Sequence, residues 1–165
     1  MVDITHKIST LRKATATAIV KVSKQETIDA VVNNLVPKGN ILEMAKTAGL
    51  FAVKNTHLSI PDCHPIPIEF TSVDYKIEGL EIQIIFNVKT VYKTGVEVEA
   101  MHGASIVALT MYDMLKPIDK EIEISTIKLI TKEGGKSSFK NKFPNVIKAA
   151  VFVCSDSIFA GDKED

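Results

Sequence analysis

The chain has 165 residues, of which 45% are hydrophobic and 24% charged, the balance of a folded globular protein with an ordinary core. Twenty Lys and Arg residues cancel twenty Asp and Glu residues, so no global field draws the chain to nucleic acid or to an anionic membrane. An anionic ligand must therefore be held by a local cluster of cations. Cys63 and Cys154 are far apart in sequence and offer no disulfide framework or zinc spacing.

The sequence shows neither a signal peptide nor a membrane-spanning stretch. The first residues, MVDITHKIST, lack the apolar core of a signal peptide, and the longest uncharged stretches are too short or too polar to span a bilayer. We therefore expect a cytoplasmic protein.

Patterns of apolar residues predict the elements in chain order. A strand at 15–22 precedes a helix with Ser23 as its N-cap, and a second helix with one apolar face runs from 41 to about 56. Residues 69–79 and 80–92 alternate around Gly79 as a β-hairpin, followed by a helix at about 97–116 and a strand at 121–131. This order, β-α-α-β-β-α-β, predicts an α+β fold resembling the ferredoxin-like class, with an antiparallel four-stranded sheet and helices on one face.

The loop 58–68, LSIPDCHPIPI, holds Cys63 and His64 between prolines. Prolines at this spacing exclude a helix, and a rigid loop that holds an imidazole is a common way to build a site. The alternative is a plain helix-to-strand connection in which His64 bonds a backbone carbonyl.

Two acidic motifs have similar alternatives. Glu97 and Glu99 share a face only in extended structure, and they also suit the first turn of a helix. Asp113 and Lys116, three apart on a helix, form either an ordinary surface pair or an acid–base pair in which Asp113 tunes Lys116.

Other patterns exclude chemistry. GGKSS at 134–138 is not a phosphate-binding P-loop, because that motif needs a glycine where Ile130 stands. No arrangement supports a serine or cysteine hydrolase, and adjacent Cys63 and His64 rarely chelate one metal ion, so we expect no metal site.

Several ordered motifs resemble one family, cyclic pyranopterin monophosphate synthase of molybdenum cofactor biosynthesis. They are Lys38-Gly39, AKTAGLFAVKNT (45–56), IPDCHP (60–65), KTGVEVEA (93–100), ALTMYDMLK (108–116) and GGKS. The match covers about four fifths of the chain, and its motifs in this order are highly specific.

The resemblance implies a reaction and an assembly. The expected enzyme, a phosphorus–oxygen lyase, converts 3′,8-cyclo-7,8-dihydroguanosine 5′-triphosphate to cyclic pyranopterin monophosphate and releases pyrophosphate. The family forms homohexamers, trimers of dimers, with sites at the dimer interface. No cofactor is implied as required, and a magnesium ion with the triphosphate or pyrophosphate stays open.

The resemblance also assigns residues. Asp113, Lys116 and Lys38 match catalytic positions. The substrate-binding positions, including the cations that a triphosphate needs, are Arg12, Lys54, Asp62, Cys63, His64, Glu97, Val98, Glu99, Lys132 and Lys136.

Three positions depart from the family pattern. Asp62 stands where an apolar residue is usual and adds negative charge, Lys54-Asn55 replaces a Lys-Arg pair, and Val98 replaces a usual Met. None of these changes removes a proposed acid–base residue.

Two other functions are compatible with this topology. A non-catalytic ferredoxin-like module that binds a nucleotide or effector would not need Asp113, Lys116 and His64 together. An RNA-binding domain is disfavoured, because the central strands lack stacking aromatics and the net charge is zero.

The composition changes after the last predicted strand. We expect a synthase domain at 1–136, a Gly-, Lys- and Ser-rich linker at 137–145, and a new apolar run at 146–165. That run is similar to the first strand and loop of a molybdopterin adenylyltransferase-like domain, which predicts a fusion of two enzymes.

Overall fold

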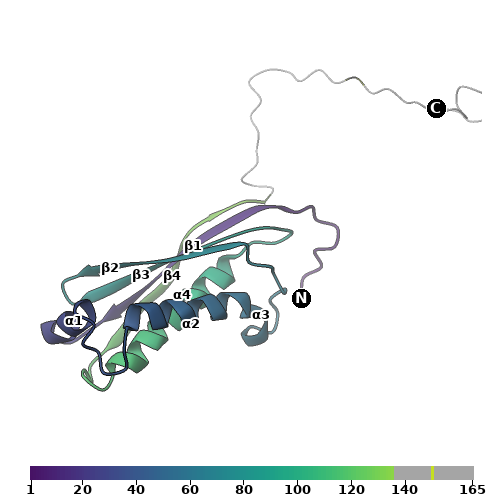
Figure 1. Cartoon of the computed structure of the whole chain (residues 1–165). Helices are drawn as coiled ribbons and strands as arrows, with labels where there is room; N and C mark the ends of the chain where they lie inside the picture. Colours follow the sequence, from purple (N-terminus) through teal and green to yellow (C-terminus); the bar gives the residue numbers. More distant parts are fainter. Residues whose placement is uncertain (136–149, 151–165) are drawn as a thin grey trace, which may run out of the picture.

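A computed structural model describes residues 1–135 and 150 (Figure 1). The elements in chain order are β1 (Thr10–Lys21), α1 (Gln25–Val32), α2 (Ile41–Lys54), α3 (Thr56–Ser59), β2 (Phe70–Glu78), β3 (Glu81–Tyr92), α4 (Glu97–Leu115) and β4 (Glu123–Glu133). The helices lie on one side of a single sheet (Figure 1). The predicted α+β fold is confirmed.

The sheet has the strand order β2-β3-β1-β4, and every neighbouring pair is antiparallel. β2 and β3 form the predicted hairpin, in which Glu78 pairs with Glu81 across a tight turn. Gly79 has a φ of +56°, a left-handed conformation that glycine adopts without steric cost. The two longest strands, β1 and β3, thus lie in the centre of the sheet.

Alternation along β1 and β3 determines which face of the sheet is covered. The residues on the helix-covered face are no more than 2% exposed: Ala14, Ala16, Ala18, Val20, Ile82, Ile84, Phe86 and Val88. Small alanines on β1 and larger residues on β3 let the two long helices pack closely on this face. Burial of these apolar side chains is the main source of folding free energy.

Close packing of α2 and α4 depends on two glycines. A Cβ at Gly49 would lie 2.5 Å from a Val107 methyl group, and a Cβ at Gly103 would overlap the Phe86 ring. α4 also carries a small-residue repeat, Ala100, Ala104 and Ala108, which is completely buried. The helix α4 is therefore fixed against both α2 and the sheet.

Some predicted boundaries were wrong. β1 begins at Thr10 rather than at residue 15, because its first residues pair with the end of β3 despite their polar character. β4 begins two residues later than predicted, and the short helix α3 was not predicted. Ser23 is not the N-cap of α1, since Lys24 holds that position and the Ser23 hydroxyl donates to Asp119 at 2.7 Å.

Within the described residues, no helix combines the length and the apolar character needed to cross a membrane.

Candidate functional site

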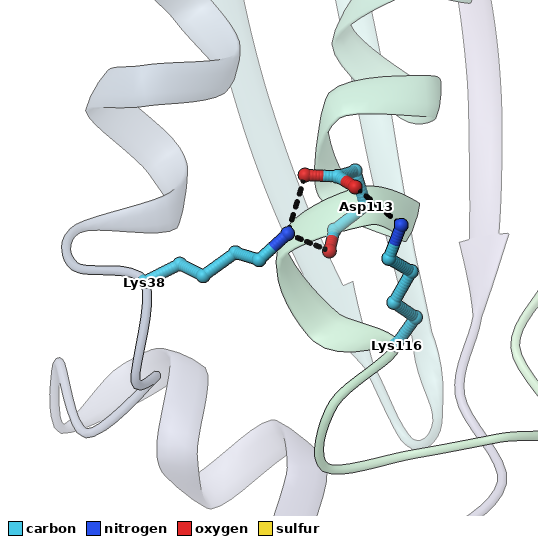
Figure 2. A network of polar contacts seen from close by, with 3 residues as sticks. All are labelled: Lys38, Asp113 and Lys116. Atoms are coloured by element: carbon cyan, nitrogen blue, oxygen red, sulfur yellow. Dashed lines mark hydrogen bonds and ion pairs between the residues drawn. The ribbon is translucent and has the colours of Figure 1, made fainter.

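The three predicted catalytic residues form one polar cluster (Figure 2). Asp113 lies in the last turn of α4, and its Oδ1 is 2.7 Å from the Lys116 Nζ. Lys38 comes from the loop between α1 and α2, and its Nζ donates to Asp113 Oδ2 at 2.6 Å and to the Asp113 carbonyl at 2.9 Å. One carboxylate thus holds two ammonium groups from different parts of the chain.

The local sequence explains how Lys38 reaches α4. Pro37 prevents a regular helix at this point, and the Gly39 N–H donates to the Val36 carbonyl at 2.9 Å in a tight turn. Gly39 has a φ of +97°, which a residue with a side chain rarely adopts. The turn projects Lys38 towards the end of α4.

The two lysines change the electrostatics of the cluster. Hydrogen bonds from Lys116 and Lys38 lower the pKa of Asp113 to about 2, so its carboxylate is ionised at neutral pH. The same contact raises the pKa of Lys116, because a hydrogen-bonded anion stabilises the ammonium form. Asp113 is therefore a fixed anion between two cations, and Lys116 is held in its ammonium form.

The predicted substrate-binding residues at the other end of α4 line one cavity of about 450 Å³. Six of them contribute to its walls: Asp62, Cys63, His64, Glu97, Val98 and Glu99. The N-terminal residues Val2, Ile4 and Lys7 close the cavity on another side, with Thr94 and Gly95 beside them. The structure brings together residues that are about 40 positions apart in the sequence.

The proline loop forms a wall of this cavity and is held at several points. Ile66 is buried in the core, and the Thr90 hydroxyl donates to the Pro67 carbonyl at 2.6 Å. The His64 Nε2 lies 2.9 Å from the Val2 carbonyl, which can only accept, so Nε2 donates. His64 thus lines a cavity, as a site loop would require, and also bonds a backbone carbonyl, as a plain connection would require. The two alternatives for this loop do not exclude each other.

The unusual Asp62 has a local partner. Its Oδ1 lies 2.6 Å from the Met1 amino group, and this contact lowers the pKa of the Asp62 carboxyl. Burial raises the pKa of the neighbouring Cys63 thiol, which keeps it in its less nucleophilic protonated form.

Glu97 and Glu99 lie in the first turn of α4 and both line the cavity, because the cavity surrounds the end of the helix. Glu99 is only 3% exposed, and burial together with the nearby Glu97 charge raises its pKa. Glu97 accepts from Lys132 at 3.0 Å. A carboxyl with a raised pKa can donate or accept a proton closer to neutral pH, so Glu99 is a candidate acid or base.

Arg12 lies in a second hollow of about 670 Å³. Its Nε donates to the Tyr92 carbonyl at 3.2 Å and its Nη2 to the Lys93 carbonyl at 3.3 Å. The two hollows adjoin, since Lys7, Thr94 and Gly95 line both. Lys7 and Lys93 were not among the predicted site residues, because an isolated lysine gives no signal in the sequence.

Three predicted cations have different positions. Lys132 reaches the cavity edge through Glu97, whereas Lys54 is exposed at the end of α2 and lines neither hollow. Lys136 lies outside the described residues.

The cluster of Lys38, Asp113 and Lys116 and the cavity do not meet within one chain. Glu99 and Asp113 lie on the same helix, 14 residues apart, which corresponds to about 21 Å along the helix axis. Proton transfer requires contact at hydrogen-bond distance. One copy of the chain therefore does not place Asp113 or Lys116 against a ligand in its own cavity.

Among residues 1–135 and 150, no three or more His, Cys, Asp or Glu side chains are arranged to hold a metal ion.

Comparison with known proteins agrees with the pattern of motifs. The model of the MoaC family matches residues 1–135. The chain belongs to the MoaC family. Its relatives include the cyclic pyranopterin monophosphate synthase of Clostridium perfringens, 48% identical over 139 residues, which are 83% of this chain and 87% of that protein.

Two further relatives of this MoaC chain cover different lengths. A probable cyclic pyranopterin monophosphate synthase from Sulfurisphaera tokodaii is 43% identical over 80% of this chain and 91% of that protein. A molybdenum cofactor biosynthesis bifunctional protein from Chlorobaculum tepidum is 42% identical over 165 residues, which are 100% of this chain and 52% of that protein.

Proposed function

We propose that the chain is a cyclic pyranopterin monophosphate synthase of molybdenum cofactor biosynthesis. It converts 3′,8-cyclo-7,8-dihydroguanosine 5′-triphosphate to cyclic pyranopterin monophosphate with release of pyrophosphate. Membership of the MoaC family and the names of its relatives support this reaction. The observation that carries the assignment of residues is the contact of Asp113 with both Lys38 and Lys116.

The cluster suits a reaction that closes a cyclic phosphate and expels pyrophosphate. Negative charge develops on phosphate oxygens as the P–O bonds exchange, and two ammonium groups fixed by one carboxylate can stabilise it. Lys116, whose ammonium form Asp113 stabilises, can supply positive charge and a proton at this point. Glu99, whose pKa is raised by burial, is suited to exchange a proton at the ring end of the substrate. We propose that Asp113 positions both lysines.

We further propose that each site is shared by two copies of the chain. The distance along α4 leaves the cluster and the cavity of one chain apart. Val98, Leu109 and Tyr112 are exposed on one stripe of α4, at rotations within about 60° of one another. A two-fold contact that packs this stripe against the antiparallel α4 of a second copy would place Asp113 beside the partner's cavity. It would also bury exposed apolar side chains.

This dimer is the proposed unit of a homohexamer built as a trimer of dimers. The proposal also includes a cytoplasmic location. No cofactor is proposed as required, and a magnesium ion would accompany the triphosphate or pyrophosphate. Turnover with and without a chelator tests the need for magnesium.

Mixing inactive variants tests the shared site. Asp113→Ala and His64→Ala chains, unfolded and refolded together in equal amounts, should regain about one quarter of wild-type turnover, because one site in four then receives both intact residues. Product pterin and pyrophosphate are measured with the cyclised dihydro-GTP as substrate. No recovery, with subunit exchange verified by mass spectrometry, would contradict the shared site.

A matched control uses two residues of one cluster. Asp113→Ala mixed with Lys38→Ala should regain nothing, because Asp113 and Lys38 lie 2.6 Å apart in one chain and every cluster keeps one defect. Wild-type protein that binds the substrate without turnover would instead favour the non-catalytic nucleotide-binding module.

The remaining proposal concerns the end of the chain. The predicted linker at 137–145 and the segment 146–165 lie outside the described residues, apart from Ala150. We propose that 146–165 begins a second, molybdopterin adenylyltransferase-like domain. The match of the whole chain to about half of a bifunctional protein supports this arrangement.

A further inference from the structure

A second carboxylate near the end of α4 is buried and lies outside the cluster. Asp119 is only 2% exposed, and its two oxygens accept four hydrogen bonds. The donors are the Ser23 N–H at 2.8 Å and hydroxyl at 2.7 Å, the Thr27 hydroxyl at 3.0 Å and the Glu121 N–H at 3.1 Å. Ser23, which the sequence suggested as the cap of α1, thus directs both of its donors to Asp119.

This carboxylate is ionised although it is buried. Desolvation raises the pKa of Asp119, but the hydrogen bonds from Ser23, Glu121 and Thr27 outweigh it and lower this pKa to about 2. Among the described residues, none forms a salt bridge with Asp119. Because hydrogen bonds are directional, four of them on one carboxylate fix the relative placement of two segments more closely than apolar packing would.

The first of these segments is the end of α4, where a hydrogen-bonded turn joins Lys116 to Asp119. The Lys116 N–H donates to the Tyr112 carbonyl at 2.9 Å. The Ile118 and Asp119 N–H groups both donate to the carbonyl of Leu115, at 2.9 and 3.0 Å, and Leu115 is completely buried. The backbone of Lys116 and that of Asp119 therefore move as one unit with the helix.

The second segment is α1, which leads to Lys38. Thr27 lies in the first turn of this eight-residue helix, is completely buried, and donates to Asp119. Beyond the other end of the helix, the Leu35 N–H donates to a carbonyl of α1 at 2.8 Å, and Val36 is buried in the core two residues before Lys38. A displacement of the start of α1 is thus transmitted to the turn that carries Lys38.

We infer that Asp119 is a positioning residue of the proposed reaction: it fixes the start of α1 to the end of α4 and thereby places Lys38 and Lys116 in the cluster. This inference rests on the proposed function. The two ammonium groups contact one carboxylate at 2.6 and 2.7 Å, and each comes from one of the two segments that Asp119 joins. A misplacement of about 1 Å can cost an enzyme a large part of its rate. Asp119 acts through the two lysines and need not contact the substrate.

Hydrogen–deuterium exchange of the full chain tests this positioning without depending on turnover. Thr27→Val removes one donor to Asp119 and keeps the shape of the side chain. It should speed exchange in the peptide 34–40, which contains the hydrogen-bonded N–H groups of Leu35 and Gly39. The expected increase is about 10-fold, the scale of one lost hydrogen bond to a charged group.

Kinetics with the proposed substrate provide the second measurement. Thr27→Val should lower kcat about 10-fold and Asp119→Asn about 100-fold, with KM within about 2-fold of wild type, because misplaced groups act on the chemical step rather than on substrate binding. In a Lys38→Ala background, Thr27→Val should lower kcat by less than about 2-fold, because the group that it positions is already absent.

Two matched variants separate positioning from a general loss of stability. Thr17→Val removes another buried hydroxyl, which donates to the Ile84 carbonyl at 2.8 Å in the middle of the sheet. This control should show wild-type kcat and wild-type exchange in 34–40. Thr27→Ser keeps the hydroxyl and should recover most of the kcat that is lost in Thr27→Val.

The two measurements distinguish this inference from the proposed function. With an active wild type, unchanged exchange in 34–40 or an unchanged kcat in an assembled Thr27→Val protein would overturn the inference. An equal loss of kcat with and without Lys38 would overturn it as well. The Thr27 variants decide by themselves if Asp119→Asn does not assemble. Faster exchange in Thr27→Val together with an inactive wild type would leave the link between Asp119 and the Lys38 turn standing and refute the proposed function instead.

Discussion

The replacement Lys116→Ala tests whether the cluster at the end of α4 is catalytic or merely an ion pair. Lys116 and Asp113 are about half exposed, with side-chain exposures of 52% and 53%. An ion pair in such a position contributes little to stability, because water screens it. Lys38 remains 2.6 Å from the other Asp113 oxygen, so the variant loses one ammonium group and keeps the rest of the cluster.

From this geometry we expect two different magnitudes. The kcat should fall by roughly 100-fold or more, the usual effect of removing a positioned proton-transfer group. The free energy of unfolding, measured by urea titration, should change little. Asp113 should remain ionised at neutral pH, since its pKa starts from about 2 and Lys38 still binds it.

The matched control is Lys46→Ala. Lys46 forms another exposed i, i+3 pair, 3.8 Å from Glu43 on α2, with side-chain exposures of 44% and 67%. Both variants are assayed for pterin and pyrophosphate formation, and their assembly is checked by size-exclusion chromatography. Turnover near the wild-type rate in a correctly assembled Lys116→Ala protein would refute the catalytic assignment. An equal loss of turnover in Lys46→Ala would show that removing any exposed lysine charge lowers the rate.

Three further outcomes are expected. Asp113→Asn removes the anion that raises the pKa of Lys116, so the Lys116 pKa should fall. The basic limb of the pH profile of kcat/KM should then move to lower pH. An unmoved limb would exclude Lys116 as the titrating group. Gly103→Ala should lower the free energy of unfolding by about 1–2 kcal/mol, because overlap with the Phe86 ring outweighs the better helix propensity of alanine. A denaturant titration that shows a gain in stability would contradict this packing. Deleting 146–165 should leave synthase turnover and assembly intact, whereas an unfolded or inactive product would assign the segment to the first domain.

The order and type of the main elements could be read from the sequence because each is amphipathic. Alternation in 80–92 predicted one strand of a hairpin, and apolar spacing predicted a helix at about 97–116; both are confirmed. Boundaries failed where tertiary contacts decided them. The first residues of β1 are polar, and they become strand because β3 offers backbone partners.

Part of the candidate site could also be predicted from local sequence. The spacing of Asp113 and Lys116 on one helix face already predicted their contact, and the proline loop predicted a fixed position for His64. The family motifs pointed to Lys38, but only the folded chain shows that its ammonium group meets Asp113 from a distant loop.

Tertiary structure alone decided how these groups are distributed. Glu97 and Glu99 share a cavity although a helix turns their side chains apart, because the cavity surrounds the helix end. Lys7 and Lys93 come together with Arg12 only through the pairing of β1 with β3 and the course of the N-terminal segment. Sequence patterns report local periodicity and side-chain chemistry, whereas the burial, proximity and charge of a site depend on contacts between segments that no local pattern contains.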